Sequence, residues 1–181
     1  MSEKEKSSRG NASQFFVAGE LCRRGYPAVV TLGNTPNTDI LCSNIEGTKF
    51  VHIQVKTFVP GSRTCTVGMK AEKDFGEKFF WVLGGIPKPN TKANFQYYII
   101  PASVMAKNVA EAHQLWLKSP GAKGQEHNKD NTIRTVHLPP HKSLSGWDIS
   151  EYLDRWDLIE TKLRAEQRVP GDAVANAPPP L

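Results

Sequence analysis

The feature that most constrains the fold of this 181-residue chain is an alternation of apolar and polar residues between positions 49 and 57. Successive side chains of a β-strand point to opposite faces, so residues two apart share a face. A lysine in the middle of an apolar strand then indicates either an ordinary exposed face or a functional site. The apolar and polar sets are Val51, Ile53 and Val55, and His52, Gln54 and Lys56.

A second short apolar strand precedes this one and contains an acid. Residues 38–42 include Asp39, and a Glu-Gly pair at positions 46 and 47 supplies a turn between the two strands. The expected hairpin therefore brings one carboxylate near the polar face that holds Gln54 and Lys56.

A helix and a further strand are predicted before this hairpin. Asn11 and Gln14 have the spacing of a capping box, and a later glycine ends the helical pattern, which places a helix at about residues 12–24. Glu20 lies at the boundary of the apolar stripe of this helix and is expected to be half-buried. A strand at residues 27–32 would complete a three-stranded meander.

The rest of the chain is predicted to mix strands and helices. Residues 58–78 are expected to hold a strand and a short helix, and they include a cationic cluster of Lys70, Lys73 and Lys78. The remaining patterns predict strands at residues 79–83, 95–100 and 132–138 and a helix at residues 102–117. A long amphipathic helix is predicted at residues 148–166, and it starts at a capping box of Asp148 and Glu151.

Composition favours a single folded domain with polar ends. The net charge of +5 and the sequence pI of about 9.1 favour a polyanionic partner. We expect a flexible N-terminus at residues 1–10, one domain at residues 11–167 and a disordered Pro/Ala-rich tail at residues 168–181. The sequence contains neither an apolar run of about 20 residues nor an apolar signal segment, which predicts a cytoplasmic protein outside the membrane.

The cysteines and histidines do not indicate a disulfide or a zinc site. The three cysteines are odd in number, widely spaced and set in apolar or strand-like contexts, so we expect reduced, buried thiols at Cys22, Cys42 and Cys65. The histidines of the C-terminal half lack ligand-like spacing with carboxylates or cysteines. They are His127, His137 and His141.

Four residues stand in an order that resembles the PD-(D/E)XK nuclease superfamily, which has the restriction-endonuclease-like fold. In that superfamily a helix carrying a Glu precedes a three-stranded meander, an Asp begins the second strand, and an acid or Gln plus a Lys occupy the third. Glu20, Asp39, Gln54 and Lys56 match this order, and the Gln makes the motif similar to the Q-x-K form of Holliday-junction-resolvase-like and Mrr-like nucleases. A proline stands three residues before Asp39, so the literal Pro-Asp pair is absent. The resemblance covers about residues 10–57 and implies an α/β fold with a central mixed β-sheet of about five strands flanked by helices.

The resemblance also implies cleavage of phosphodiester bonds that depends on Mg²⁺, for which Mn²⁺ can substitute. The reaction must stabilise negative charge around phosphorus and deliver a deprotonated water, and both tasks suit a divalent cation. Mg²⁺ prefers oxygen ligands and usually takes one or two protein carboxylates together with substrate phosphate and waters. The expected catalytic and metal-binding groups are the carboxylates of Asp39 and Glu20, the side-chain oxygen of Gln54, the backbone carbonyl of Val55, and Lys56, which would polarise the attacking water and steady phosphate charge.

Other residues near the motif are candidates for contact with DNA, and each has a structural alternative. Arg9, Arg23 and Arg24 flank the Glu20 helix and either contact the phosphate backbone or stay solvated at the helix ends. His52 and Thr57 either line the cleft or make hydrogen bonds that belong to the strand.

The expected function is therefore a metal-dependent DNA endonuclease in restriction, defence or DNA processing. A homodimer would suit cleavage of both strands. The alternative is a DNA-binding module of the same fold that has lost catalysis, because Gln54 stands where related motifs have a second acid. A ribonuclease, or an accessory protein acting through a partner, is a third possibility.

Overall fold

The computed structural model describes residues 3–31, 35–121, 123–129 and 131–164 of the chain. The helices of this part are α1 (Glu3–Arg23), α2 (Ala102–Lys118) and α3 (Asp157–Leu163), with two 3₁₀ helices, η1 (Met69–Glu72) and η2 (Ser150–Tyr152). The strands are β1 (Ala28–Val30), β2 (Ile40–Ser43), β3 (Phe50–Phe58), β4 (Thr64–Thr66), β5 (Phe79–Gly85), β6 (Gln96–Pro101) and β7 (Thr135–His137).

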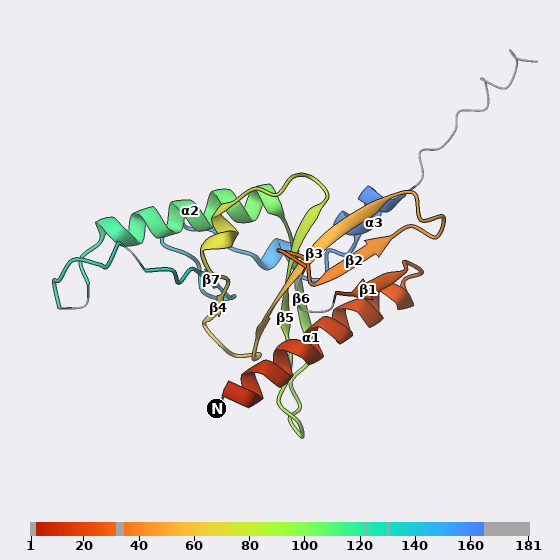
Figure 1. Cartoon of the computed structure of the whole chain (residues 1–181). Helices are drawn as coiled ribbons and strands as arrows, with labels where there is room; N and C mark the ends of the chain where they lie inside the picture. Colours follow the sequence, from red (N-terminus) through yellow and green to blue (C-terminus); the bar gives the residue numbers. More distant parts are fainter. Residues whose placement is uncertain (1–2, 32–34, 122, 130, 165–181) are drawn as a thin grey trace, which may run out of the picture.

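Five of these strands form a central mixed sheet in the order β1-β2-β3-β5-β6 (Figure 1). β1, β2 and β3 make an antiparallel meander, β3 and β5 pair in parallel, and β6 returns antiparallel to β5. A parallel pair needs a long crossover connection, which residues 59–78 supply. The α/β fold with a five-stranded mixed sheet is therefore confirmed, and so is the predicted order of a helix followed by a three-stranded meander.

Helices cover both faces of the sheet, and this explains the composition of β5. Figure 1 shows α2 on one side of the sheet and α1 on the other. One apolar cluster lies between the sheet and α2, and a second lies between the sheet and the pair α1 and α3. Trp81 and Leu83 belong to the first cluster, whereas Phe80 and Val82 belong to the second. A strand buried on both faces is typically a nearly continuous apolar run, which is what β5 shows.

The crossover between β3 and β5 contains β4 and η1, in agreement with the predicted strand and short helix. β4 pairs antiparallel with β7 in a separate two-stranded sheet. Buried Arg134, next to β7, forms an ion pair with Glu72 of η1. This contact ties the crossover to the C-terminal part of the domain.

The predicted start of the first helix is wrong. α1 begins at Glu3, so Asn11 and Gln14 lie inside the helix and do not cap it. Residues 3–10, which we expected to belong to a flexible N-terminus, are helical. The Glu and Lys residues at the start are good helix formers, and they outweigh the unfavourable Gly10. The predicted tail at residues 168–181 lies outside the described residues.

The single long helix predicted for residues 148–166 is also wrong. The chain forms η2 and then the short α3, separated by residues 153–156. Leu153 makes an isolated β-bridge with Tyr98, and the Asp154 N–H donates to the Tyr97 carbonyl at 2.7 Å. Because β6 is an edge strand with unpaired backbone groups, this non-local pairing competes with continuation of the helix.

The cysteines are free thiols, as predicted, but only two of them are buried. Burial raises the pKa of Cys42 and of Cys65 to about 12 in each case. Cys22 is exposed on α1, which corrects the expectation of a buried thiol. In the described part of the chain, no helix combines the length and apolar composition needed to cross a bilayer.

Two glycine substitutions are expected to have opposite effects on stability. A Cβ at Gly85 of β5 would lie 2.6 Å from Cζ of Phe58 and 3.1 Å from Cβ of Gln96, so Gly85→Ala should lower the free energy of unfolding by about 1–3 kcal/mol. A Cβ at Gly19 of α1 would meet nothing within 4 Å, so Gly19→Ala should raise it by up to about 1 kcal/mol. Urea denaturation of both variants measures the difference, and equal effects of the two substitutions would contradict the packing around β5.

Candidate active site

Asp39 lies directly before β2, and its backbone is held by the strands on both sides. Its N–H donates to the Ile53 carbonyl at 2.9 Å, and its carbonyl accepts the Thr31 N–H at 2.9 Å. The Asp39 backbone is therefore bonded to the segment after β1 on one side and to β3 on the other. The regular pairing of β2 with β3 begins one residue later, at Ile40.

The Asp39 side chain is bonded to two consecutive residues of β3. Its Oδ2 atom accepts the Val55 N–H at 2.7 Å and also accepts Nε2 of Gln54. Burial raises the pKa of Asp39, against the opposing effects of the Val55 N–H, the Lys56 charge, the Gln54 amide and the Lys70 charge. The hydrogen bonds and positive charges around the ionised carboxylate therefore do not fully offset the cost of its desolvation.

These residues open onto a cleft of about 590 Å³, called the central cleft below. Asp39, Gln54 and Lys56 line it together, so the structure brings together three of the four predicted catalytic residues. Lys70 of η1 and Trp81 of β5 also line it. Sequence reasoning noted Lys70 only as part of a cationic cluster, because its place beside β3 depends on the path of the crossover.

Glu20, the fourth predicted residue, is not among the described residues that line the central cleft. Its carboxylate accepts two hydrogen bonds from Arg23, both 2.7 Å long, and one from Arg24 at 2.8 Å. Arg24 also contacts Glu160 of α3 at 3.2 Å and lies over the ring of Trp156. The Arg23 hydrogen bond is the main cause of the lowered pKa of Glu20. These residues join the C-terminal end of α1 to α3.

The side chains of α1 that approach Asp39 come from nearer its N-terminus. Asn11 and Gln14 line a groove of about 380 Å³ that shares Thr35 and Asp39 with the central cleft. We call this the amide groove and define it by Asn11, Gln14, Thr31 and Thr38. Sequence reasoning used Asn11 and Gln14 as a helix cap and therefore missed them as site residues.

The predicted DNA-contacting residues fall into separate places. Arg9 and Thr57 line one groove of about 470 Å³, called the hydroxyl groove and defined by Arg9, Thr57, Ser62, Thr64 and Thr66. His52 is exposed on β3, and its Nδ1 shares a hydrogen bond of 3.2 Å with the hydroxyl of Thr38. Arg23 and Arg24 lie with Glu20 and are not brought to either groove.

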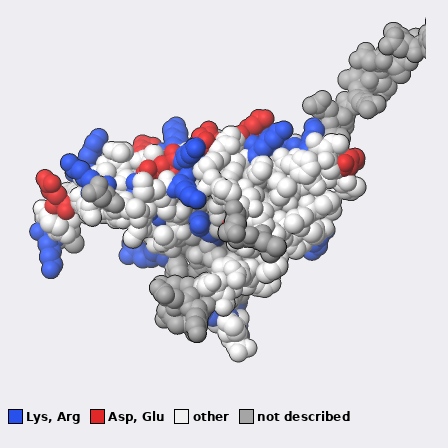
Figure 2. All heavy atoms as spheres, in the orientation of Figure 1, with Lys and Arg blue, Asp and Glu red and all other residues white. Residues whose placement is uncertain are grey.

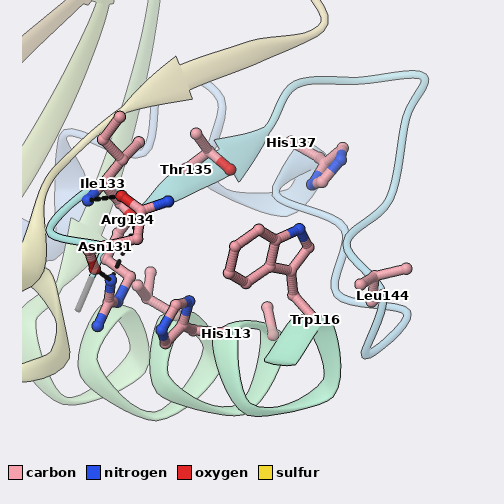
Figure 3. A pocket seen from close by; sticks show the side chains of 10 residues that line it. His113, Trp116, Asn131, Ile133, Arg134, Thr135, His137 and Leu144 are labelled. Carbon is pink, nitrogen blue, oxygen red and sulfur yellow. Dashed lines mark hydrogen bonds between the residues drawn. The ribbon is translucent and has the colours of Figure 1, made fainter. Parts of the chain in front are cut away.

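A more enclosed cavity of about 200 Å³ lies between α2 and β7, away from these residues (Figure 3). His113 and Trp116 project from α2, and Arg134 and His137 come from the β7 segment. The Arg134 guanidinium is bonded to the Glu72 carboxylate, so the charged group of this cavity is already neutralised. Its described lining contains two histidines and no carboxylate, and no group of three or more potential metal ligands occurs in the described part of the chain.

The residues of the central cleft fit a weakly held divalent cation. No group of three or more His, Cys, Asp or Glu side chains that could hold a metal occurs among the described residues. Within that part of the chain, Asp39 is the one carboxylate lining the cleft, and the Gln54 amide offers a further oxygen. Mg²⁺ commonly uses one or two carboxylates and completes its coordination with water and phosphate oxygens. This donor set therefore suits a cation shared with a bound phosphate.

Solved structures that are distantly similar to the chain include two nucleases. The chain is similar to the bacterial homing endonuclease I-Ssp6803I, with 18% sequence identity, a TM-score of 0.49, and coverage of 87% of this chain and 93% of that chain. It is also similar to Hjc, a Holliday junction resolvase from Archaeoglobus fulgidus, with 14% identity, a TM-score of 0.38, and coverage of 76% and 96% respectively. No protein-family model and no curated protein matches the chain.

Asp39→Asn is expected to raise the thermal stability of the protein at neutral pH in EDTA. Burial makes the ionised carboxylate costly, whereas the single amide oxygen of Asn can accept both hydrogen bonds that Oδ2 now accepts. The pKa of Asp39 is higher in the folded state than its unfolded value of about 3.9. At pH values above the folded-state pKa, the ionised side chain therefore destabilises the folded protein. The advantage of the variant should therefore shrink as the pH falls toward about 4. Melting temperatures of both proteins across this pH range measure it.

Asp157→Asn serves as a control with the opposite sign. The hydrogen bond from Arg155 lowers the pKa of Asp157, so its stabilising effect is present at neutral pH and is lost as the pH falls through the lowered folded-state pKa. This variant should be less stable than wild type at neutral pH. If the melting temperature of Asp39→Asn is also below that of wild type at neutral pH and approaches it in acid, the ionised Asp39 stabilises the fold. That result would contradict the assignment of Asp39 as a carboxylate whose desolvation cost is not fully offset.

Proposed function

We propose that this chain is a divalent-metal-dependent endonuclease that hydrolyses phosphodiester bonds in DNA. The observation that supports this function best is the convergence of Asp39, Gln54 and Lys56 in the central cleft. An acid, an amide oxygen and an ammonium group together suit a bound cation and a phosphate, which is the combination that phosphodiester hydrolysis needs.

Asp39 would be the main ligand of Mg²⁺ or Mn²⁺, with the side-chain oxygen of Gln54 and the backbone carbonyl of Val55 as further ligands. When bound, the cation would stabilise negative charge on the phosphate and favour deprotonation of the attacking water. The raised pKa of Asp39 supports this role, because a half-buried carboxylate whose desolvation is not fully offset by its neighbours is stabilised by a nearby cation.

Two lysines from separate elements would hold the phosphate. Lys56 follows Gln54 by two residues on β3, so both side chains lie on one face, and its ammonium can donate to a phosphate oxygen or to the attacking water. Lys70 reaches the same cleft from η1. Positive charge from two directions favours an anionic substrate over a neutral one.

The second candidate function is a DNA-binding module that does not cleave. One observation favours it: Asp39 is the one carboxylate of the central cleft among the described residues, and part of its hydrogen-bonding capacity is taken by Gln54 and Val55. A homodimer would place two clefts on one DNA duplex and stays a prediction for either function.

A cleavage assay separates these functions. Supercoiled plasmid incubated with wild-type protein and Mg²⁺ or Mn²⁺ should be nicked, and Asp39→Asn and Lys56→Ala should each reduce the rate at least about 100-fold. Lys107→Ala is the matched control, since Lys107 is an exposed lysine of α2 that does not line the central cleft. Binding without nicking in wild type would support the non-cleaving module.

Glu20→Gln tests the position of the site within the fold. Glu20 is engaged with Arg23 and Arg24, so this variant should cleave at the wild-type rate while losing some thermal stability. Loss of cleavage in this variant, together with normal cleavage by Asp39→Asn, would overturn the site at the central cleft.

Gln54→Glu is expected to strengthen the response to metal. A second carboxylate beside Asp39 adds a like charge, so the melting temperature in EDTA should fall below that of wild type. Saturating Mn²⁺ should then raise the melting temperature of this variant by more than it raises that of wild type, because a ligand that binds only the folded state stabilises it. Equal shifts in the two proteins would argue against a cation at Asp39 and Gln54.

A further inference from the structure

The amide groove and the central cleft are two depressions that meet at Asp39. They share two lining residues, Thr35 and Asp39. The groove takes further lining from α1, whereas the cleft takes further lining from β3 and η1. A ligand held in the cleft can therefore extend past Asp39 into the amide groove.

The two depressions differ in charge. Among the described residues, Lys56 and Lys70 line the central cleft, whereas the amide groove is lined by no charged side chain apart from the shared Asp39. Figure 2 shows that charged side chains gather along the upper edge of one face, while the surface over α1 and β1 is mostly uncharged. A phosphate is therefore favoured in the cleft, and a neutral group is favoured in the groove.

Two side-chain amides of the groove are available to a ligand. Within the described part of the chain, the side chains of Asn11 and Gln14 have no hydrogen-bond partner. On α2, by contrast, the amide of Asn108 donates to the Val104 carbonyl at 2.9 Å. Each free amide offers one acceptor oxygen and two N–H donors. The edge of a nucleobase presents donors beside acceptors, and Asn and Gln pair best with adenine in this way.

An exposed aromatic ring stands beside these amides on α1. Phe15 lines the same groove and is 66% exposed. Asn11, Gln14 and Phe15 have the i, i+3 and i+4 spacing that puts side chains on one face of a helix. The ring of Phe16 packs edge-on against Phe95 at 4.8 Å between centroids, whereas Phe15 has no aromatic partner among the described residues. A free ring face of this kind can stack on a base.

We propose that the amide groove binds one unstacked base of the substrate DNA, with a preference for adenine, while an adjoining phosphate lies in the central cleft. Phe15 stacks on the face of the base, and Asn11 and Gln14 form hydrogen bonds with its edge. The base must leave the duplex stack, because its faces are covered by its neighbours in an intact helix. This inference rests on the proposed function in one respect, which is the identity of the ligand as DNA.

The test measures binding of short fluorescently labelled DNA duplexes by anisotropy, in Ca²⁺ to prevent cleavage. The duplexes differ only at one extrahelical position, which holds adenine, thymine or an abasic sugar. All three have the extra backbone unit at the same place, so differences in Kd report contacts with the base. Wild type should bind the adenine duplex at least about fivefold more tightly than the abasic duplex. It should also prefer adenine to thymine at least about fivefold.

Substitutions in the groove should remove these differences without weakening binding to the abasic duplex, because the phosphate contacts stay intact. Phe15→Ala should bring the Kd values of the adenine and abasic duplexes within about threefold of each other. The Asn11→Ala Gln14→Ala double variant should bring those of the adenine and thymine duplexes within about twofold. Phe50→Ala and Gln114→Ala are the matched controls, since both residues are exposed and line neither the groove nor the cleft. Both controls should bind like wild type.

Two results would overturn the proposal. Equal affinities of wild type for the adenine and abasic duplexes would show that the protein does not bind the base. Differences of wild-type size in both Phe15→Ala and the double amide variant would place the base elsewhere on the surface.

The binding test does not depend on catalysis, so the two proposals can fail separately. If the base contacts are found but Mg²⁺ and Mn²⁺ give no nicking, the endonuclease function fails and the base site stands. If wild type nicks plasmid DNA but binds the adenine and abasic duplexes equally, the base site fails alone.

Discussion

The two hydrogen bonds accepted by Oδ2 of Asp39 are the interaction on which the central cleft depends. The Val55 N–H lies on the side of β3 that faces β2, just beyond the last ladder pair between these strands, Ile40 with Ile53. The carboxylate oxygen thus takes the place of a backbone acceptor and extends the pairing by a side chain. Because the same atom accepts the Gln54 amide, it also turns that side chain toward Asp39. One carboxylate oxygen therefore joins the start of β2 to Gln54 and Val55, two consecutive residues of β3.

The sheet gives this arrangement a rigid frame. β3 is paired on one side with β2 and on the other with β5, where Gln54 lies opposite Trp81 and Lys56 opposite Leu83. β5 is buried on both faces, so the strand next to the cleft is fixed by both apolar clusters. Functional side chains on a central strand are held more precisely than side chains on loops. The grooves beside the cleft instead use α1, β4 and the segments that follow β1 and β3.

Local patterns were sufficient to predict the elements that hold the polar residues, but not the way the helices pack. The alternation between Val51 and Lys56 predicts β3 and its polar face because strand periodicity is a local property. The proximity of Asp39 to Gln54 also follows, since a short turn determines the register of a hairpin.

The helical wheel of α1 gives the face on which Glu20 lies but not the place along the sheet where that face packs. Its partners were nevertheless visible at i+3 and i+4, where Arg23 and Arg24 stand. The break at Leu153 depends on Tyr98, more than fifty positions earlier in the chain, and no local signal reports such a contact.

Compared with a second acid at the same position, the amide of Gln54 changes the net charge of the cleft more than its shape. Among the described residues that line the cleft, one carboxylate, Asp39, stands against Lys56 and Lys70, so their charges sum to a positive value before any ligand binds. Such a cleft attracts a phosphate more readily than it attracts a divalent cation. A phosphate in the cleft would supply the negative charge that Gln54 does not, and the affinity for the cation would rise. Since thermodynamic coupling is reciprocal, the cation would raise the affinity for DNA by the same factor. In the proposed enzyme, replacing an acid by Gln54 would therefore make metal binding conditional on substrate, so that the reactive site is assembled only on DNA.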